Sequence, residues 1–521
     1  MTKEIKPLHT EESPLLSQGG AKHSNGDVEN AKVNITSANG DADGDVKSNH
    51  DHDEHATLWH DILDTFHLSL PIFVSRVSFV GMTTTDTALL GHVSGQSLSA
   101  AALSDLWRSC TAVLIRGRVL GIVVGQAIGA KNEGLAFIYL KISCLILGAL
   151  SIIVILSWTF TEQIWVYLGQ SPTIAKDAQY YSSVFIASIP ASLWFGQLAQ
   201  FLSAQRIMRP EVITSLLALG CNLILGITLV LGIPSLGFEG YGFAACPWVT
   251  VVVVWCQAIF LTSIWLQKHY HTLPNQKQQQ STTNPSKILS AWTRGITLER
   301  IRTFSALYYP AALATSSDFW RMGVIGEIAA TIGEREVGVF NASYRIMWIT
   351  IIFVGSLAGA AGIKIGMRLG RGDADGARRA AAVGIGLAIS FLFVLSAMVY
   401  CNMRALGMLF TNDPSYLELF VECRWPFTCV LFFMNLSVGI ETIPMSMGQT
   451  GKVFYAGFVA SWFGQVPGVI LLTRYWRKDL YGLYTGVAVG YCVLVFIYGW
   501  LAYSSDYRKY SEIARKRAEV A

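Results

Sequence analysis

The sequence predicts an all-α polytopic membrane protein, with about twelve transmembrane helices in two six-helix repeat lobes. Three observations lead to this fold class. Of the 521 residues, 52% are apolar and 14% are charged, whereas soluble domains are about 25% charged. Apolar runs near the ~20 residues that span a bilayer recur along most of the chain. Finally, the phrase "GQAIGAKNEG" (125–134) has an echo in "GMRLGRGDADGARR" (366–379).

The N-terminal residues 1–58 are expected to form a disordered acidic cytoplasmic tail. Residues 1–60 contain eleven acidic and five basic side chains and show no apolar period. The tail lacks the basic and apolar regions of a signal peptide, so we expect no cleavage. Its "EESPLL" fits an acidic dileucine sorting signal, which adaptor proteins would bind through Glu11, Leu15 and Leu16, although so short a pattern also arises by chance.

Two groups of six apolar runs follow the tail. An N-terminal lobe (59–266) and a C-terminal lobe (304–503) are separated by a Gln-rich linker (267–303), and a basic tail (504–521) ends the chain. The expected spans are 62–90, 97–125, 135–158, 178–204, 211–233, 240–266, 304–331, 337–363, 380–400, 418–446, 454–473 and 482–503.

Lys and Arg in the loops predict the orientation. Loops on the side of the two termini are richer in these residues, although "RYWRKD" (474–479) lies on the other side. Because basic loops stay in the cytoplasm, both termini and the linker are placed there. The dileucine pattern adds a vacuolar or lysosomal membrane to the plasma membrane as a possible location.

The repeated phrase indicates an internal duplication. Aligning Gly129 on Gly370 gives an offset of 241 residues, and nearly the same offset brings Pro71 onto Pro310. Gln126 stands in the first phrase, at the same end of the second helix. Such repeats are typical of secondary transporters, in which two halves enclose a midplane site. The alternative is chance recurrence in a chain with 47 glycines.

Six stretches in order resemble the multidrug and toxic compound extrusion (MATE) transporters. The resemblance covers roughly residues 60–505. It implies a secondary active antiporter that exports organic solutes, such as xenobiotics or secondary metabolites, by alternating access of two lobes. Protons or sodium ions would be the coupling ions, and no other cofactor is implied. The stretches are "TDTALLGHVSG" (84–94), "GQAIGAKNEG" (125–134), "QFLSAQRIMRPEV" (200–212), "CNLILGITLVLGIPSLGFEGYGFAA" (221–245), "IKIGMRLGRGDADGARRA" (363–380) and "LYGLYTGVAVG" (480–490).

Acids inside the apolar runs are candidates for ion coupling, because a charge at the bilayer centre is costly. A desolvated Asp86 would prefer its neutral form and could carry a proton, and the family resemblance places a coupling acid there; alternatively, it is a helix-end acid wetted from outside. Asp318 would bind a coupling ion or cation, or pair internally with Arg321. Glu327 would replace a second family acid, whose position here is Gly323.

Four further residues are candidates for substrate binding. Arg116 and Arg118 fall in the second helix, where they would line a cavity for an organic anion, snorkel, or pair internally, one of them with Asp86. Trp320 is placed to stack on a flat solute, although such residues more often pack the core. Glu441 is an acid within the tenth helix.

Other functions find less support. No HExxH motif, no GxSxG motif in a suitable context and no Walker loop occurs, so neither a membrane enzyme nor ATP-driven transport is predicted. No basic patch interleaved with aromatics indicates nucleic acid. The nine cysteines form no CxxC pair, and the His-rich run 49–60 fits a solvated segment better than a metal site. The main alternative is a flippase of the same superfamily for an anionic lipid-linked or organic-anion substrate, which Arg76, Arg116 and Arg118 favour.

Overall fold

The computed structural model describes residues 43–519 apart from 234–236, 270–293 and 412. The chain divides into two compact units, Met1–Glu54 and His55–Ala521. The described part of the first unit is the start of helix α1, which begins at Asp43 within the range 1–58 that we expected to be disordered. Acidic side chains favour a helix N-terminus, which fits this early start. The dileucine residues Glu11, Leu15 and Leu16 lie outside the described residues.

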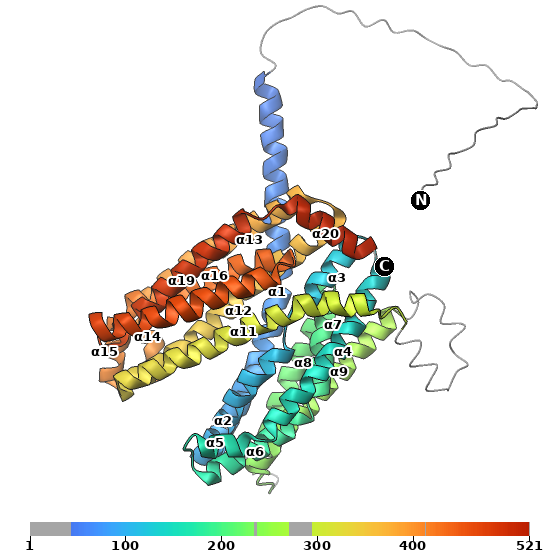
Figure 1. The fold of residues 1–521 in the computed structure, drawn as a ribbon. Helices are drawn as coiled ribbons and strands as arrows, with labels where there is room; N and C mark the ends of the chain where they lie inside the picture. Colours follow the sequence, from blue (N-terminus) through green and yellow to red (C-terminus); the bar gives the residue numbers. More distant parts are fainter. Residues whose placement is uncertain (1–42, 234–236, 270–293, 412, 520–521) are drawn as a thin grey trace, which may run out of the picture. The chain divides into compact units, whose positions relative to one another are not determined.

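The described part of the unit His55–Ala521 is built of helices joined by short connections (Figure 1). In the N-terminal half they are α1 (Asp43–Val93), α2 (Gly95–Ala112), α3 (Val119–Gly129), α4 (Glu133–Trp158), α5 (Thr161–Tyr167), α6 (Pro172–Ile186), α7 (Ile189–Ala204), α8 (Arg209–Gly226) and α9 (Ala245–His269). In the C-terminal half they are α11 (Leu298–Ile332), α12 (Glu334–Arg371), α13 (Ala374–Cys401), α14 (Met403–Met408), α15 (Pro414–Glu422), α16 (Arg424–Ser446), α17 (Thr450–Val459), α18 (Val466–Leu471), α19 (Leu480–Tyr503) and α20 (Tyr507–Glu519).

The predicted all-α membrane fold is confirmed. Within the described residues, 10 helices are long and apolar enough to cross a membrane, or 11 if the bent pair α6–α7 is one span. Helix α11, the expected seventh span, is long enough but too polar to be counted with them.

Three expected spans are interrupted. The second is split between α2 and α3 by a 3-10 turn, Val113–Ile115, and by the non-helical Arg116 and Arg118. The fourth bends by 53° between α6 and α7, where Pro190 in the first turn of α7 lacks the N–H that a continuous helix needs. The tenth is split at Cys423 between α15 and α16. Hydropathy alone marks none of these breaks.

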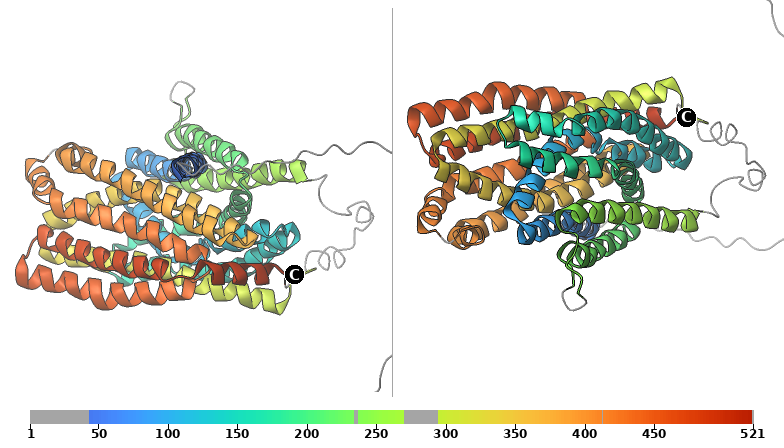
Figure 2. Two further views of the ribbon diagram at one scale, coloured as in Figure 1. Left: turned by 90° about the horizontal axis from the view of Figure 1, so that it is seen from above. Right: turned by 90° about the horizontal axis from the view of Figure 1, so that it is seen from below.

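Each half has its own apolar core. One cluster of buried side chains comes from α11–α20, and two others come mainly from the N-terminal half. Helix α11 contributes to both, since Phe304 and Leu307 join an N-terminal cluster and Ile325 and Ala329 join the C-terminal one. Figure 2 shows α13, α16 and α19 of the C-terminal lobe packed as a layer. The halves are therefore two lobes that α11 connects.

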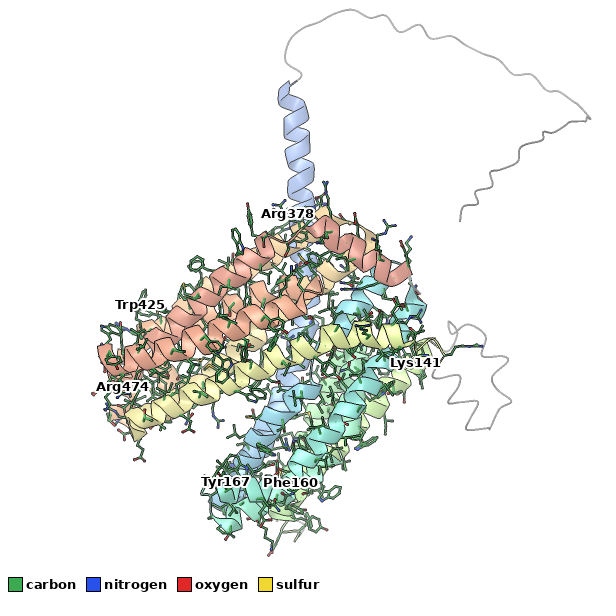
Figure 3. All side chains as sticks on the ribbon, viewed as in Figure 1. Lys141, Phe160, Tyr167, Arg378, Trp425 and Arg474 are labelled. Carbon is green, nitrogen blue, oxygen red and sulfur yellow. The ribbon has the colours of Figure 1, made fainter. Side chains whose placement is uncertain are left out.

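Large apolar side chains cover the outer faces of both lobes. Phe160 and Tyr167 on the N-terminal lobe and Trp425 on the C-terminal lobe are exposed, as Figure 3 shows. Many leucines, isoleucines and valines of the long helices are exposed as well. Exposed apolar surface of this extent marks contact with an apolar environment, which for helices of this length is lipid.

The two lobes meet at the repeated phrases. A Cβ on Gly129 of α3 would collide with the carbonyl of Met367 on α12, and a Cβ on Gly370 of α12 would collide with the carbonyl of Gln126 on α3. The echoed glycines therefore face each other across the lobes, and glycine is needed for the backbones to approach. We call this region, formed by 126–132, 367–373 and α20, the closed end.

Candidate functional site

Asp86 lies in a buried polar site inside the N-terminal lobe. It is on α1 and only 4% exposed. Its carboxylate accepts hydrogen bonds from Asn222 Nδ2 on α8 at 3.0 Å and from Thr250 Oγ1 on α9 at 2.6 Å. The alternative in which the outside wets Asp86 is therefore wrong. A buried carboxylate held only by neutral donors has no ion pair to break when it takes up a proton.

The hydroxyl of Thr250 offers a way to satisfy both protonation states of Asp86. Besides Asp86, Thr250 Oγ1 lies 3.2 Å from Asn222 Oδ1. A hydroxyl has one proton to donate and two lone pairs. It can donate to a charged Asp86, or rotate, donate to Asn222 and accept the proton of a neutral Asp86. The oxygens of these three side chains are also of the type that hard cations bind.

The expectation that Arg116 or Arg118 pairs with Asp86 is wrong, since neither forms an ion pair within the described residues. A different arginine lies nearby. Arg108 on α2 pairs with Asp105 at 3.0 Å, and its guanidinium carbon lies 3.4 Å from the ring centroid of Phe185. The pair is neutralised within one helix turn, which leaves Asp86 to its neutral partners.

In the C-terminal lobe, Asp318 and Arg321 on α11 form the expected internal pair. Arg321 Nη2 lies 3.0 Å from Asp318 Oδ1, and the arginine is 2% exposed whereas Asp318 is 50% exposed. The guanidinium also donates to Ser461 Oγ and, at 3.1 Å, to Tyr491 OH on α19. Arg321 is thus fixed by three partners from three segments, and the carboxylate presents its free side.

The other expected residues of this lobe are not all brought together. Glu441 on α16 is partly buried and close enough to interact electrostatically with Asp318 and Arg321. Glu327 is exposed and lies nine residues beyond Asp318, about 13.5 Å along an ideal helix. It therefore does not join the Asp318 cluster. Trp320 is exposed and, among the described residues, stacks on no ring.

A buried charge cluster joins the lobes near the closed end. Lys364 Nζ on α12 lies 3.1 Å from Asp61 Oδ1 and 3.0 Å from Asp64 Oδ2, both on α1. It also donates to Thr65 Oγ1 at 3.2 Å. Arg368 Nη2 binds the same Asp61 at 2.7 Å. Each of these bonds joins α1 to α12, so separating the lobes would leave buried charges without partners. Because such a state is costly, the cluster stabilises the contact between the lobes.

Helix α20 crosses the closed end. Ser511 Oγ donates to the carbonyl of Leu369 on α12 at 3.0 Å. Arg517 Nη1 donates to Gln126 Oε1 on α3 at 3.3 Å, and Asn132 Nδ2 donates to the carbonyl of Ala518 at 3.0 Å. The basic C-terminal tail predicted at 504–521 is therefore in large part an amphipathic helix that contacts both lobes.

Comparison with known proteins agrees with this architecture. The MatE family model matches the chain twice, over residues 71–228 and 310–470. The chain belongs to the MatE family. The two matches begin at Pro71 and Pro310, the prolines that the repeat aligned. Each half of this MatE protein therefore matches the same family model, which supports the internal duplication.

Relatives of this MatE protein are transporters. An uncharacterized transporter of Schizosaccharomyces pombe is 25% identical over 466 residues, 88% of this chain and 83% of the relative. Multidrug and toxin extrusion protein 1 of Danio rerio is 23% identical over 466 residues, 88% of this chain and 75% of the relative. The crystal structure of the eukaryotic MATE transporter AtDTX14 superposes with a TM-score of 0.77 at 19% identity, covering 88% of this chain and 99% of that one.

Sequence reasoning missed several polar residues of this MatE protein. Asp105 and Arg108 stand in the same apolar run as Arg116, so the rule that selected Arg116 applies to them too. Asn222 and Thr250 carry no charge, and only the packing of α8 and α9 on α1 brings them to Asp86. Lys364 fell one residue outside an expected span that ended at 363, whereas α12 continues to Arg371.

Proposed function

We propose that this MatE protein is a secondary active antiporter that exports organic solutes, xenobiotics or secondary metabolites, in exchange for protons or sodium ions. The two lobes alternate in access around a site between them, and Asp86 is the coupling acid. The observation that carries the proposal is the buried Asp86 carboxylate, which hydrogen-bonds to Asn222 and Thr250 without a basic partner in the described residues.

The geometry at Asp86 supports reversible ion binding. An isolated buried charge is costly, so an ion that neutralises Asp86 is held more firmly there than at an exposed carboxylate. The hydroxyl of Thr250 accommodates the added proton by exchanging its acceptor for Asn222. For sodium, the same three oxygen-bearing side chains supply ligands. A coupling site of this kind binds from one side and releases to the other as the lobes rearrange.

The C-terminal lobe supplies the substrate site in this proposal. Asp318 keeps one free side beyond its pair with Arg321, and Glu441 adds a second carboxylate nearby. Trp320 lies two residues from Asp318, on the opposite side of α11, and is therefore given no role in this cluster. Glu327, which faces away from this cluster along the helix, is given no role in it.

We further propose that both termini face the cytoplasm, in the plasma membrane or a vacuolar or lysosomal membrane. The supporting observation is the concentration of Lys and Arg at and beside the closed end, in loops and in adjoining helix ends such as the start of α13, where Arg378 lies (Figure 3). Cysteine accessibility decides the orientation. Glu133→Cys, at the exposed first residue of α4 at that end, should react with an impermeant maleimide only after intact cells are opened.

Solute uptake by the purified protein in proteoliposomes tests the antiport. Rhodamine 123, an aromatic cation, and carboxyfluorescein, an aromatic anion, are offered under an imposed proton or sodium gradient. Uptake that follows one gradient in the wild type and loses that dependence in Asp86→Asn supports the proposal. Asp177→Asn, an acid of the same lobe that accepts a hydrogen bond from Gln96 at an exposed position, is the control and should stay coupled. Gradient-driven uptake that survives intact in Asp86→Asn refutes the assignment of Asp86.

A flippase for an anionic lipid-linked substrate is the second candidate, because Arg116 and Arg118 are exposed and form no ion pair within the described residues. A flippase would move a labelled anionic lipid between leaflets with no imposed ion gradient. Lipid scrambling by the wild type without any gradient-driven uptake of the soluble dyes would therefore favour this function over antiport.

A further inference from the structure

The second membrane span is interrupted near its middle by a 3-10 turn and a short non-helical segment. Helix α2 ends at Ala112 and α3 begins at Val119, and the span runs from Gly95 to Gly129. Arg116 and Arg118 have φ/ψ of −103°/12° and −103°/25°, outside the helical region. Irregular backbone at membrane depth is tolerated where it lies within protein or lines a water-filled cavity.

The freed backbone groups of the break are satisfied by side chains. The hydroxyl of Tyr308 on α11 donates to the carbonyl of Leu114 at 2.8 Å and accepts from Gly117 N–H at 3.3 Å. Gln200 Nε2 donates to the carbonyl of Gly117 at 3.3 Å. A Cβ on Gly117 would stand 2.6 Å from the Tyr308 ring. The break is thus a stable feature, and it lies against α11, the helix that connects the lobes.

The two arginines of the break have no acidic partner, unlike three other arginines of the spans. Arg108, Arg321 and Arg368 each pair with an acid. Arg116 and Arg118 are both exposed, and within the described part of the chain neither has an ion pair or a side-chain hydrogen bond. An unpaired charge inside a span is unfavourable unless it faces water or a ligand.

The acids within electrostatic reach of these arginines are already engaged. Asp105 acts on Arg116 but pairs with Arg108. Glu211 acts on Arg118, yet its two carboxylate oxygens accept from Ser75 at 2.8 Å and Ser203 at 2.9 Å. Neither acid comes within ion-pair distance of the two arginines. The break therefore keeps positive charge that is free to bind another anion.

Further features beside the break favour an aromatic anion. The guanidinium carbon of Arg116 lies 5.6 Å from the ring centroid of Phe79 on α1. Arg76, one turn earlier on α1, reaches toward Gly355 and has no ion pair among the described residues either.

We propose that Arg116 and Arg118 form a subsite for the negatively charged group of an aromatic organic anion. The proposal rests on the proposed transport function and adds an anion subsite in the N-terminal lobe to the carboxylate site of the C-terminal lobe. The arginines would bind a carboxylate or phosphate oxygen with charge-assisted hydrogen bonds. Phe79, which is exposed, provides apolar surface for the ring. Such an anion would enter between α1, the α2–α3 break and α11.

Equilibrium binding to the full-length protein in detergent tests the subsite, because it needs no ion gradient. The probe is carboxyfluorescein, followed by fluorescence polarisation. The variants are Arg116→Gln, Arg118→Gln and Arg116→Lys, and the control is Arg345→Gln, an exposed arginine on α12. The thermal midpoint of each variant shows that it is folded. Dihexanoyl phosphatidate and benzoate serve as competitors to distinguish a lipid from a soluble anion.

We expect each Gln variant to weaken carboxyfluorescein binding about tenfold or more, the scale of one lost charge-assisted hydrogen bond. Arg116→Lys should retain part of the affinity, and Arg345→Gln should bind as the wild type does. Displacement by benzoate or by dihexanoyl phosphatidate supports the subsite and tells which source of anion it prefers. Wild-type affinity in both Gln variants, or no anion binding by the wild type, overturns it. Asp86→Asn should still bind the dye in detergent even though it loses gradient-driven uptake. Failure of the antiport proposal is therefore distinguishable from failure of the anion subsite.

Discussion

Removing the charge of Lys364 should open the closed end. Lys364 is 1% exposed and lies within 3.2 Å of Asp61, Asp64 and Thr65 on α1. Lys364→Met keeps the length and the apolar stem of the side chain but removes the ammonium group. Because every one of these bonds runs between lobes, the substitution acts on the contact between lobes more than on the fold of either.

The size of the effect follows from burial. Breaking a buried ion pair by removing one partner costs about 3–5 kcal/mol. Asp61 keeps Arg368 at 2.7 Å, and Asp64 is partly exposed and keeps Arg206 at 3.2 Å, which reduces the loss. We therefore expect about 2 kcal/mol in favour of separated lobes, a shift of roughly 30-fold in their equilibrium.

The control variant uses the same acid. Arg206→Gln also removes a partner of Asp64, but Arg206 is 42% exposed and its bond stays inside the N-terminal lobe. A surface pair of this kind contributes about 0.2–1 kcal/mol. The lobe equilibrium should therefore change little in this variant.

Spin labels measure the separation. Labels at Glu133→Cys and Asp375→Cys place one exposed probe on each lobe at the closed end, in a background with Cys221, Cys256 and Cys401, the exposed native cysteines, replaced by Ser. Electron spin distance measurements should show a longer-distance population in Lys364→Met and the wild-type distribution in Arg206→Gln. The reasoning is refuted if Lys364→Met leaves the distribution unchanged while its thermal stability falls, because the cluster would then support the fold and not the closure.

Three further substitutions test other contacts. Thr250→Val removes the hydroxyl between Asp86 and Asn222 and should abolish gradient-driven uptake in proteoliposomes, whereas Thr250→Ser should retain it. Equal uptake by both variants contradicts the proposed exchange of hydrogen-bond acceptor at Thr250. Gly370→Ala should destabilise the closed end by about 1–3 kcal/mol in the spin-label assay, whereas Gly366→Ala, whose Cβ would lie 3.8 Å from its nearest neighbour, should not. Arg321→Gln should lower the thermal midpoint, because it leaves Asp318 without its partner; a midpoint equal to that of the wild type contradicts a structural role.

The sequence predicted those site residues whose type alone carries a physical cost or advantage, such as a charged residue in an apolar run. The cost of a charge in an apolar run singled out Asp86, Asp318 and Arg321. In the structure Asp86 is buried, and Asp318 and Arg321 form the expected pair. The repeat marked Gly129 and Gly370, and the structure explains their residue type, because only glycine lets two helix backbones come so close. The fold class followed from the composition, the apolar run lengths and the repeated phrase.

The sequence was less informative where tertiary packing decides. Glu327 has the right chemistry, but continuation of α11 as one unbroken helix carries it away from Asp318. The neutral partners Asn222 and Thr250 have no signal that separates them from other polar residues in spans. The break at Arg116 depends on Tyr308, almost two hundred residues away in the chain, which takes the place of a helical hydrogen bond. Local sequence patterns do not predict a hydrogen bond from a residue so distant in the chain.

Helix α1 connects the parts of this molecule that the transport cycle must coordinate. It carries Asp86 at one point and Asp61 about 37 Å away along the same helix, at 1.5 Å per residue. Between them, Phe73 stacks on Phe353 of the other lobe with centroids 4.3 Å apart. Pro71, inside the helix, removes one backbone hydrogen bond at this intermediate position. In the antiport that we propose, a change in the path of α1 driven by the charge of Asp86 would alter the geometry at Asp61, because α1 contacts both the Asp86 site and the opposite lobe. Coupling of this kind would need no chain of side chains through either core, since α1, with its missing hydrogen bond at Pro71, would connect the two events.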